Sequence, residues 1–421
     1  MAGGEVALPV LAVEQEAVKR LNEKHGVIAN YGGKCRVLSW DRWNINKQVL
    51  VPTFQSFDAF KQRYCHKSVT LGRGLKPVAA GEFWLTNPDR QNYEAVECDP
   101  SGPAVLVGNV LNLWRGFAVS PRRGSWKLLR DHIAKVMAAG DPKAFDYIIR
   151  WLAWAVQNPG KRAEAVLVFQ GGEGAGKGTL ARVMLKIFGV HGLAISEPQM
   201  LVGDFSGHLQ YCVFLFLDEA FWPGDRKYEG KLKNMITEPT CMIHPKFVTP
   251  FPVINLLHMM WVTNNDWAVP ASHDARRYAV FKVSEERVDD FGYFDALYAE
   301  IDGGGVEAML WDLLRLDLGK WHPKLVYKTA ALQQQKQLSL HGLDAWIEAM
   351  LQEGMLPKPF SKKYPNRCLT EHLEAAARHY DRYTNSTRLT GKLKELLKVE
   401  PFNNQEARGW IFPPLPECRR V

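Results

Sequence analysis

The chain has 421 residues, of which 46% are hydrophobic and 23% are charged, and its formal net charge is +8. This length is more than one hydrophobic core usually supports, so we expect three domains and a connecting region. No apolar run approaches the roughly 20 residues that cross a bilayer, which argues against a membrane protein.

The N-terminal sequence and the cysteines indicate an intracellular protein. Acidic residues interrupt the first apolar run and no basic head precedes it, so a secretory signal is not predicted. The seven cysteines form no CxxC pair, which argues against a zinc ribbon and a disulfide framework. We therefore expect reduced thiols and a cytoplasmic location. The positive net charge favours a polyanionic partner such as nucleic acid, but it does not identify one.

Residues 1–125 and 126–160 precede the candidate functional motifs. Residues 1–125 contain short strand-like runs, CRVLSW and AVLVGNVLNLW, between turn signals, which predicts a mixed α+β N-terminal domain. No paired Asp motif for two-metal nucleotide polymerisation occurs there, so a primase activity is not predicted for it. Residues 126–160 change to helical spacing and are expected to form a helical collar or linker, with Pro142 in the first turn of the second helix.

Residues 161–318 alternate buried strands with helices, which predicts an α/β domain. The runs AEAVLVFQ, YCVFLFLDEA and LLHMMWVTNND are nearly continuous in apolar residues, as in parallel strands covered on both faces. Each run ends in polar residues. Because the carboxyl ends of parallel strands meet at one edge of a sheet, we expect a single ligand-binding edge there.

The stretch GGEGAGKGT lies between the first of these strands and a predicted helix, which is typical of a phosphate loop. Its glycines let backbone N–H groups turn toward phosphates, and Lys177 would neutralise the β and γ phosphates of ATP. Gly178 stands where most such loops have Ser or Thr, so the first hydroxyl available for Mg²⁺ is that of Thr179. The predicted nucleotide-binding residues are Gly171, Gly172, Glu173, Gly174, Ala175, Gly176, Lys177, Gly178 and Thr179.

The ends of the next two strands supply the predicted catalytic side chains. Asp218 is expected to hold Mg²⁺, and Glu219 to orient or deprotonate the water that attacks the γ-phosphate. Asn264, with Asn265 as a substitute, would sense the γ-phosphate. Further along, Arg276 and Arg277 precede another strand and suit an arginine finger that reaches the nucleotide of a neighbouring subunit.

GAGKGT is also how the loop of adenylate kinases reads, so a nucleoside monophosphate kinase is an alternative. The resemblance to that family stops at the loop. A phosphoryl transferase must exclude water and would have no use for Glu219 as a base.

The order of phosphate loop, LDEA, KLKNMITEP, TNN and ARR over residues 145–300 resembles the superfamily-3 helicases of the AAA+ class. The helicase domains of phage and plasmid primase-helicases are the most similar. The resemblance implies a P-loop ATPase core that uses ATP and Mg²⁺ and assembles into a homo-oligomeric, hexameric ring. The implied DNA partners are single-stranded and forked DNA, with a separate primase or polymerase as a further partner. The implied setting is the cytoplasm of a bacterial host.

In that family a hairpin lies between the acidic strand and the sensor strand, and CMIHPKFVTPFPV predicts such a hairpin here. Lys246 at its tip, with His244 and Phe247 beside it, could hold a DNA phosphate and stack on a base. Lys231 and Lys233 are further candidates for DNA contact.

Residues 319–421 are expected to form a helical, winged-helix-like C-terminal domain. Its segment 361–398 is basic, TGKLKELLKV would be a recognition-like helix and RGWIF a wing. Duplex or origin binding and a plain packing role both remain open for this domain. The sequence therefore predicts an ATP-dependent helicase, with a replication initiator or loader that binds DNA without unwinding it as the alternative.

Overall fold

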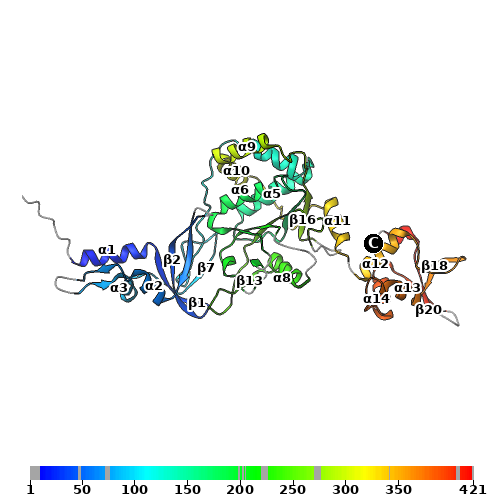
Figure 1. Ribbon diagram of the computed structural model, residues 1–421, viewed down its shortest axis with the longest axis horizontal. Helices are drawn as coiled ribbons and strands as arrows, with labels where there is room; N and C mark the ends of the chain where they lie inside the picture. Colours follow the sequence, from blue (N-terminus) through cyan, green and yellow to red (C-terminus); the bar gives the residue numbers. More distant parts are fainter. Residues whose placement is uncertain are drawn as a thin grey trace, which may run out of the picture. The chain divides into compact units, whose positions relative to one another are not determined.

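The computed structural model describes residues 10–45, 49–71, 76–197, 200–201, 203, 205–219, 226–269, 276–340, 342–403 and 408–419. The chain is a mixed α/β protein with several sheets, and it divides into two compact units (Figure 1). The first unit runs to Ala268 and continues over Arg276–Leu332, and the second is formed by Gln333–Val421 with Val269. No described helix has the length and apolar character needed to cross a bilayer.

The N-terminal part of the first unit is built on a four-stranded sheet of order β3-β2-β1-β6. Its strands and helices are α1 (Val10–Asn22), β1 (His25–Tyr31), β2 (Lys34–Asn44), β3 (Val49–Gln55), α2 (Phe57–Tyr64), α3 (Ala80–Thr86) and β6 (Asn92–Tyr93). Phe60 and Trp84 pack with Val37 in a core between the helices and the sheet. The run AVLVGNVLNLW forms β8 (Val105–Leu106) and β9 (Val110–Asn112), so both predicted strand regions are confirmed.

A five-stranded parallel sheet of order β11-β12-β15-β10-β16 forms the centre of the first unit. Its strands are β10 (Val166–Gln170), β11 (Gly192–Ile195), β12 (Phe214–Asp218), β15 (His258–Thr263) and β16 (Tyr278–Lys282). Every residue of β10 and β15 is buried, as the nearly continuous apolar runs predicted. The strands predicted from the sequence are confirmed, and β11 is an addition that its short, mixed run GLAI did not reveal.

Helices cover this sheet and share its core. They are α4 (Lys127–His132), the π-helical turn η1 (Ile133–Met137), α5 (Pro142–Gln157), α6 (Lys177–Phe188), α9 (Phe291–Glu300) and α10 (Val306–Leu313). Asp141 caps α5 by accepting hydrogen bonds from the N–H groups of Lys143 and Ala144, and Pro142 occupies the first turn as predicted. The Trp151 indole donates to the carbonyl of Ala165 at 3.0 Å, which ties α5 to the start of β10.

The predicted hairpin is present as β13 (Thr240–Ile243) and β14 (Phe251–Ile254), and it follows α8 (Arg226–Thr237). Its outer end contacts the β1–β2 turn, because the Thr249 N–H donates to the carbonyl of Gly32 at 3.2 Å. The Tyr31 ring meets the Phe251 ring edge-on at 5.3 Å. The hairpin is thus braced by the N-terminal sheet.

The second unit contains helices and an antiparallel sheet of order β17-β18-β20-β19. Its elements are most of α11 (Ala330–Leu338), then α12 (Leu343–Glu353), β17 (Pro359–Ser361), β18 (Tyr364–Leu369), α13 (Thr370–Arg378), α14 (Ser386–Leu397), β19 (Glu400–Asn403), β20 (Arg408–Ile411) and α15 (Leu415–Cys418). Trp346, Leu373 and Leu389 are in its core. The predicted helices and the extended RGWIF segment are confirmed, whereas the hairpin β17–β18 was missed.

Candidate functional site

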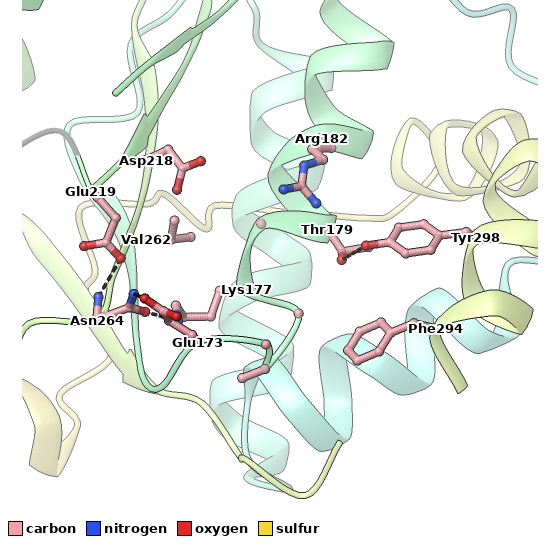
Figure 2. A pocket seen from close by; sticks show the side chains of 14 residues that line it. Glu173, Lys177, Thr179, Arg182, Asp218, Glu219, Val262, Asn264, Phe294 and Tyr298 are labelled. Atoms are coloured by element: carbon pink, nitrogen blue, oxygen red, sulfur yellow. Dashed lines mark hydrogen bonds between the residues drawn. The ribbon is translucent and has the colours of Figure 1, made fainter. Parts of the chain in front are cut away.

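A pocket of about 340 Å³ lies at the carboxyl edge of the central sheet (Figure 2). The parallel register pairs Gln170 with Thr263 and Asp218 with Val262, so β10, β12 and β15 end nearly level. This alignment brings the loop after β10 and the polar ends of the other two strands together. The lining residues are Glu173, Gly174, Ala175, Gly176, Lys177, Gly178, Thr179, Arg182, Asp218, Glu219, Val262, Asn264, Phe294 and Tyr298.

The loop that leads from β10 into α6 depends on glycine at specific positions. Gly174 and Gly176 have φ values of +73° and +82°, in the left-handed region that side-chain-bearing residues rarely adopt. A Cβ at Gly171 would overlap the side chain of Val283. The Gly172 N–H donates to Oε1 of Glu285 at 3.1 Å. Gly171 and Gly172 therefore shape the base of the loop, and residues 173–179 face the pocket.

The Lys177 ammonium is held by three oxygen acceptors. Its Nζ donates to the carbonyls of Gly171 at 2.8 Å and Gly172 at 2.5 Å, and to Oδ1 of Asn264 at 2.6 Å. Burial lowers the pKa of Lys177, while the carboxylates of Glu219 and other nearby acids act in the opposite direction. The lysine thus joins the loop to the end of β15.

The two acids after β12 differ in how they are held. Glu219 accepts a hydrogen bond at Oε1 from the Asn264 N–H at 2.8 Å, and Thr263 Oγ1 approaches its Oε2 at 3.4 Å. Its backbone has a φ of +54° and is fixed by a hydrogen bond to the carbonyl of Val262. Asp218 is half-buried, and its carboxylate makes no hydrogen bond or ion pair with any described residue. Its oxygens are therefore available to a ligand.

Thr179 is fully buried and its hydroxyl is 3.2 Å from the hydroxyl of Tyr298 on α9. Thr179 and Asp218 line the same pocket, so a hydroxyl and a carboxylate oxygen, both suited to Mg²⁺, face one space. The residues present fit a magnesium ion bound together with phosphates. Such an ion would compete with Tyr298 for the threonine hydroxyl.

A buried histidine, His132, contacts the backbone of the glycine-rich loop. His132 Nε2 lies 3.2 Å from the carbonyl of Gly176 and Nδ1 lies 3.0 Å from the hydroxyl of Tyr293. Burial lowers the pKa of His132 to about 4, so the ring is neutral at pH 7. Because the Gly176 carbonyl can only accept, Nε2 carries the proton and Tyr293 donates to Nδ1.

Several predicted residues do not line the pocket. Arg276 is exposed and Arg277 is half-buried just before β16, where the Arg277 carbonyl accepts from Val166 at 2.8 Å. Lys231 and Lys233 lie on α8, and the Lys231 ammonium donates to the carbonyl of Gly203 at 3.1 Å. Asn265 does not line the pocket either, and its backbone carbonyl accepts a hydrogen bond from the Gln170 side chain at 3.1 Å.

The hairpin residues form a separate surface at the tip of β13–β14. Phe247 is 84% exposed and has a φ of +64°. The Lys246 ammonium lies 5.3 Å from the centre of the Phe205 ring, which also meets the His244 ring at 5.4 Å. The tip therefore presents cationic and aromatic groups side by side.

Sequence reasoning missed the pocket residues of α9 and one pocket residue of α6. Phe294 and Tyr298 are four residues apart on α9, and the sequence gives no sign that α9 packs beside the glycine-rich loop. Arg182 follows Gly178 by four residues on α6, so the helical period places both on one face. That spacing could have identified Arg182.

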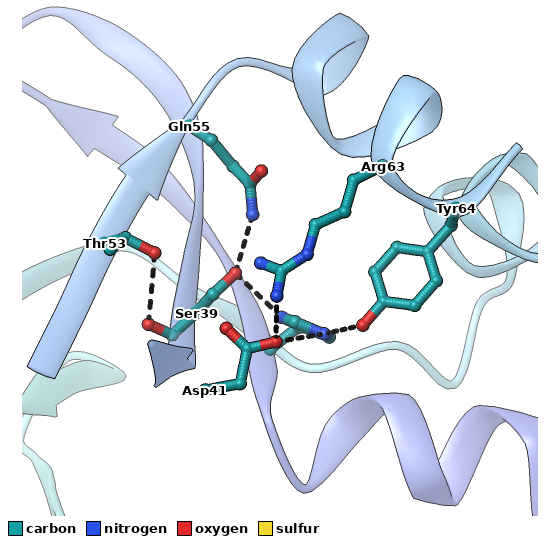
Figure 3. A network of polar contacts seen from close by, with 7 residues as sticks. Ser39, Asp41, Thr53, Gln55, Arg63 and Tyr64 are labelled. Atoms are coloured by element: carbon teal, nitrogen blue, oxygen red, sulfur yellow. Dashed lines mark hydrogen bonds and ion pairs between the residues drawn. The ribbon is translucent and has the colours of Figure 1, made fainter. Parts of the chain in front are cut away.

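A second polar cluster, in the N-terminal sheet, is structural (Figure 3). His25 lies between the Ser39 hydroxyl at 2.8 Å and the Tyr64 hydroxyl at 2.7 Å, and Asp41 pairs with Arg63 at 2.6 Å. Ser, His and Asp in one cluster could suggest a nucleophile. Ser39 is completely buried and His25 is 2% exposed, so no substrate reaches them.

Comparison with known proteins gives three findings. A family of unknown function (DUF5906) matches residues 169–277. The DNA primase-polymerase of Nitratiruptor phage NrS-1 is 24% identical over 164 residues, which are 38% of this chain and 23% of that protein. Two structures of the NrS-1 C-terminal region, one of residues 305–718, share the fold with TM-scores of 0.69 and 0.67 at 16% identity. They cover 95% and 94% of this chain, and 99% of each matched chain.

The sequence match thus covers less than a quarter of the length of the phage primase-polymerase and about two fifths of this chain. The structural likeness extends over nearly the whole chain and shows a shared fold.

Gly176→Ala is expected to destabilise the protein by about 2–4 kcal/mol, because the new Cβ would lie 2.7 Å from both His132 and Phe294 on a left-handed backbone. The matched control is Gly140→Ala, where φ is +78° and no atom lies within 4 Å. That variant should lose only about 1 kcal/mol. Urea unfolding followed by tryptophan fluorescence measures both, and equal losses would contradict the packing argument.

Stability is expected to fall as the pH drops from about 6.5 toward 4. Burial lowers the pKa values of His25, His132 and His258 to about 4 from an ordinary 6.5. The unfolded chain therefore binds these protons first, which favours unfolding by about 1–3 kcal/mol per histidine at pH 4. Urea midpoints at pH 7.5, 6 and 5 test this. A midpoint that stays constant or rises on acidification would show that these rings titrate normally.

Proposed function

We propose that the chain is an ATP-dependent DNA helicase of superfamily 3, with an AAA+-type core, acting in phage or mobile-element DNA replication. The observation that carries the proposal is the hydrogen bond from Lys177 of the phosphate loop to Asn264, the residue whose N–H also binds Glu219. Asn264 thereby connects Lys177, the proposed phosphate-binding residue, to Glu219, the proposed water-activating acid, in one pocket. The sequence relation to a phage DNA primase-polymerase supports the replication setting.

In this proposal each pocket residue has a task in ATP hydrolysis. Lys177 and the loop N–H groups bind the phosphates, and Asp218 with Thr179 would hold Mg²⁺, which neutralises charge that develops on the phosphates. Glu219, fixed by the Asn264 N–H, orients the attacking water and accepts its proton. Asn264 contacts the γ-phosphate when Lys177 turns from it to the nucleotide.

The DNA-binding part of the proposal rests on the hairpin tip. Lys246 and His244 would hold phosphates of single-stranded DNA, and the exposed ring of Phe247 would stack on a base. Arg276 and Arg277 do not line the pocket of their own subunit. In a hexameric ring they would act as arginine fingers in the pocket of the neighbouring subunit. ATP hydrolysis then depends on assembly.

A replication initiator or loader, which binds DNA without unwinding it, is the second candidate. The second unit favours it, because the Arg367 guanidinium lies 4.2 Å from the centre of the Tyr364 ring and 5.6 Å from that of Phe402. Such cationic and aromatic groups suit nucleic acid. A nucleoside monophosphate kinase is less well supported, because Glu219 in the pocket favours attack by water.

Two variants separate binding from hydrolysis. Lys177→Ala should lose ATP binding and lower ATPase kcat/KM by at least about 100-fold, because it removes the phosphate-binding cation. Glu219→Gln should keep ATP affinity within about 3-fold but lower kcat by about 100-fold or more. Nucleotide titration and ATPase rates with single-stranded DNA measure both effects.

Strand displacement on forked DNA separates the two candidate functions. Wild type should unwind the fork with ATP, and both variants should bind DNA without unwinding it. ATP hydrolysis by wild type without strand displacement would favour the loader, and no ATP binding by wild type would overturn the proposal altogether.

A further inference from the structure

Arg182 lies on α6, one helical turn after the phosphate loop, and its side chain lines the same pocket (Figure 2). Helical side chains lean toward the N-terminus of their helix, so Arg182 extends back along the face that carries Gly178. A Cβ at Gly178 would lie 3.5 Å from both Cζ and Nη2 of Arg182. The guanidinium therefore occupies the space beside the glycine that follows Lys177.

Of the two cations that line the pocket, Lys177 has hydrogen-bond acceptors in the protein and the Arg182 side chain has none among the described residues. Three acids line the pocket, Glu173, Asp218 and Glu219, and its two cations are Lys177 and Arg182. The Lys177 ammonium is already bonded to three oxygens of the protein.

Arg182 is exposed, and its guanidinium makes no hydrogen bond or ion pair with any residue in the described part of the chain. Lys186, one turn further along α6, is by contrast paired with Asp302 at 2.7 Å. A guanidinium kept without a partner at the mouth of a cavity is available to an anionic ligand.

We propose that Arg182 binds a phosphate group of the nucleotide in the pocket of its own subunit. This inference rests on the proposed function, in which the pocket takes a nucleoside triphosphate. A guanidinium presents two parallel N–H donors that match two phosphate oxygens, so its contact is stronger and more directional than that of a neutral donor. Gly178 then has a physical reason: a side chain larger than a methyl group at this position would compete with the Arg182 guanidinium for the same space.

The test compares Arg182→Ala with Lys186→Ala, which removes the other exposed cation of the same helix outside the pocket. Arg182→Ala should weaken ATP binding by about 10- to 100-fold in a fluorescent-nucleotide titration. It should also reduce the ATP-induced rise in unfolding temperature and leave the ligand-free unfolding temperature unchanged. Lys186→Ala should bind ATP as wild type does.

Equal ATP affinity for wild type and Arg182→Ala would overturn the inference while leaving the proposed function intact. A lower unfolding temperature of ligand-free Arg182→Ala would also overturn it, because it would assign Arg182 a structural role. If wild type itself fails to bind ATP, and Lys177→Ala has no effect, the proposed function fails first. ATP binding by the wild-type protein thus distinguishes failure of the Arg182 inference from failure of the proposed function.

Discussion

The Lys177 ammonium is the group on which the geometry of the pocket depends. Its three acceptors are two carbonyls of its own loop and the amide oxygen of Asn264 at the end of the neighbouring strand. A mostly buried ammonium needs such acceptors, because an unpaired charge out of water is costly. The loop is therefore held in its curled form, and the ends of β10 and β15 are joined across the pocket, before any ligand arrives.

Asn264 connects the Lys177 ammonium to Glu219. Its side chain accepts a hydrogen bond from Lys177 while its N–H donates to Glu219, so one residue contacts both the predicted phosphate-binding lysine and the predicted base. In the proposed function, a γ-phosphate that draws Lys177 away leaves the Asn264 amide free to bind that phosphate. Arrival of the nucleotide is then sensed at the residue that positions Glu219.

Much of this arrangement could be predicted from the sequence because local patterns specify it. The buried strands end in polar residues, and the glycine loop lies between a strand and a helix, so the position of Lys177, Asp218 and Asn264 at one sheet edge follows from chain connectivity. Tyr298, Phe294 and His132 could not be predicted in the same way. They reach the loop through the packing of α4 and α9, which depends on contacts between segments more than a hundred residues apart.

Gly178 stands where most phosphate loops have Ser or Thr. In the sequence, it is a missing hydroxyl that leaves the magnesium ligand open. In the fold, it is an open position beside Arg182, and the neighbouring hydroxyl of Thr179 is bonded to Tyr298. Where most loops have a hydroxyl-bearing residue, this chain thus has a glycine beside the Arg182 guanidinium, and the next residue, Thr179, contacts the Tyr298 ring hydroxyl.

A structure with a non-hydrolysable ATP analogue and Mg²⁺ would show whether this pocket binds ATP through Lys177. We expect phosphates in the curl of residues 173–179, with Lys177 Nζ moved from Asn264 to a phosphate oxygen and with Mg²⁺ near Asp218 and Thr179. A nucleotide bound elsewhere, or a Lys177 that stays on the loop carbonyls with no phosphate within hydrogen-bond distance, would show that Lys177 does not bind ATP in this pocket.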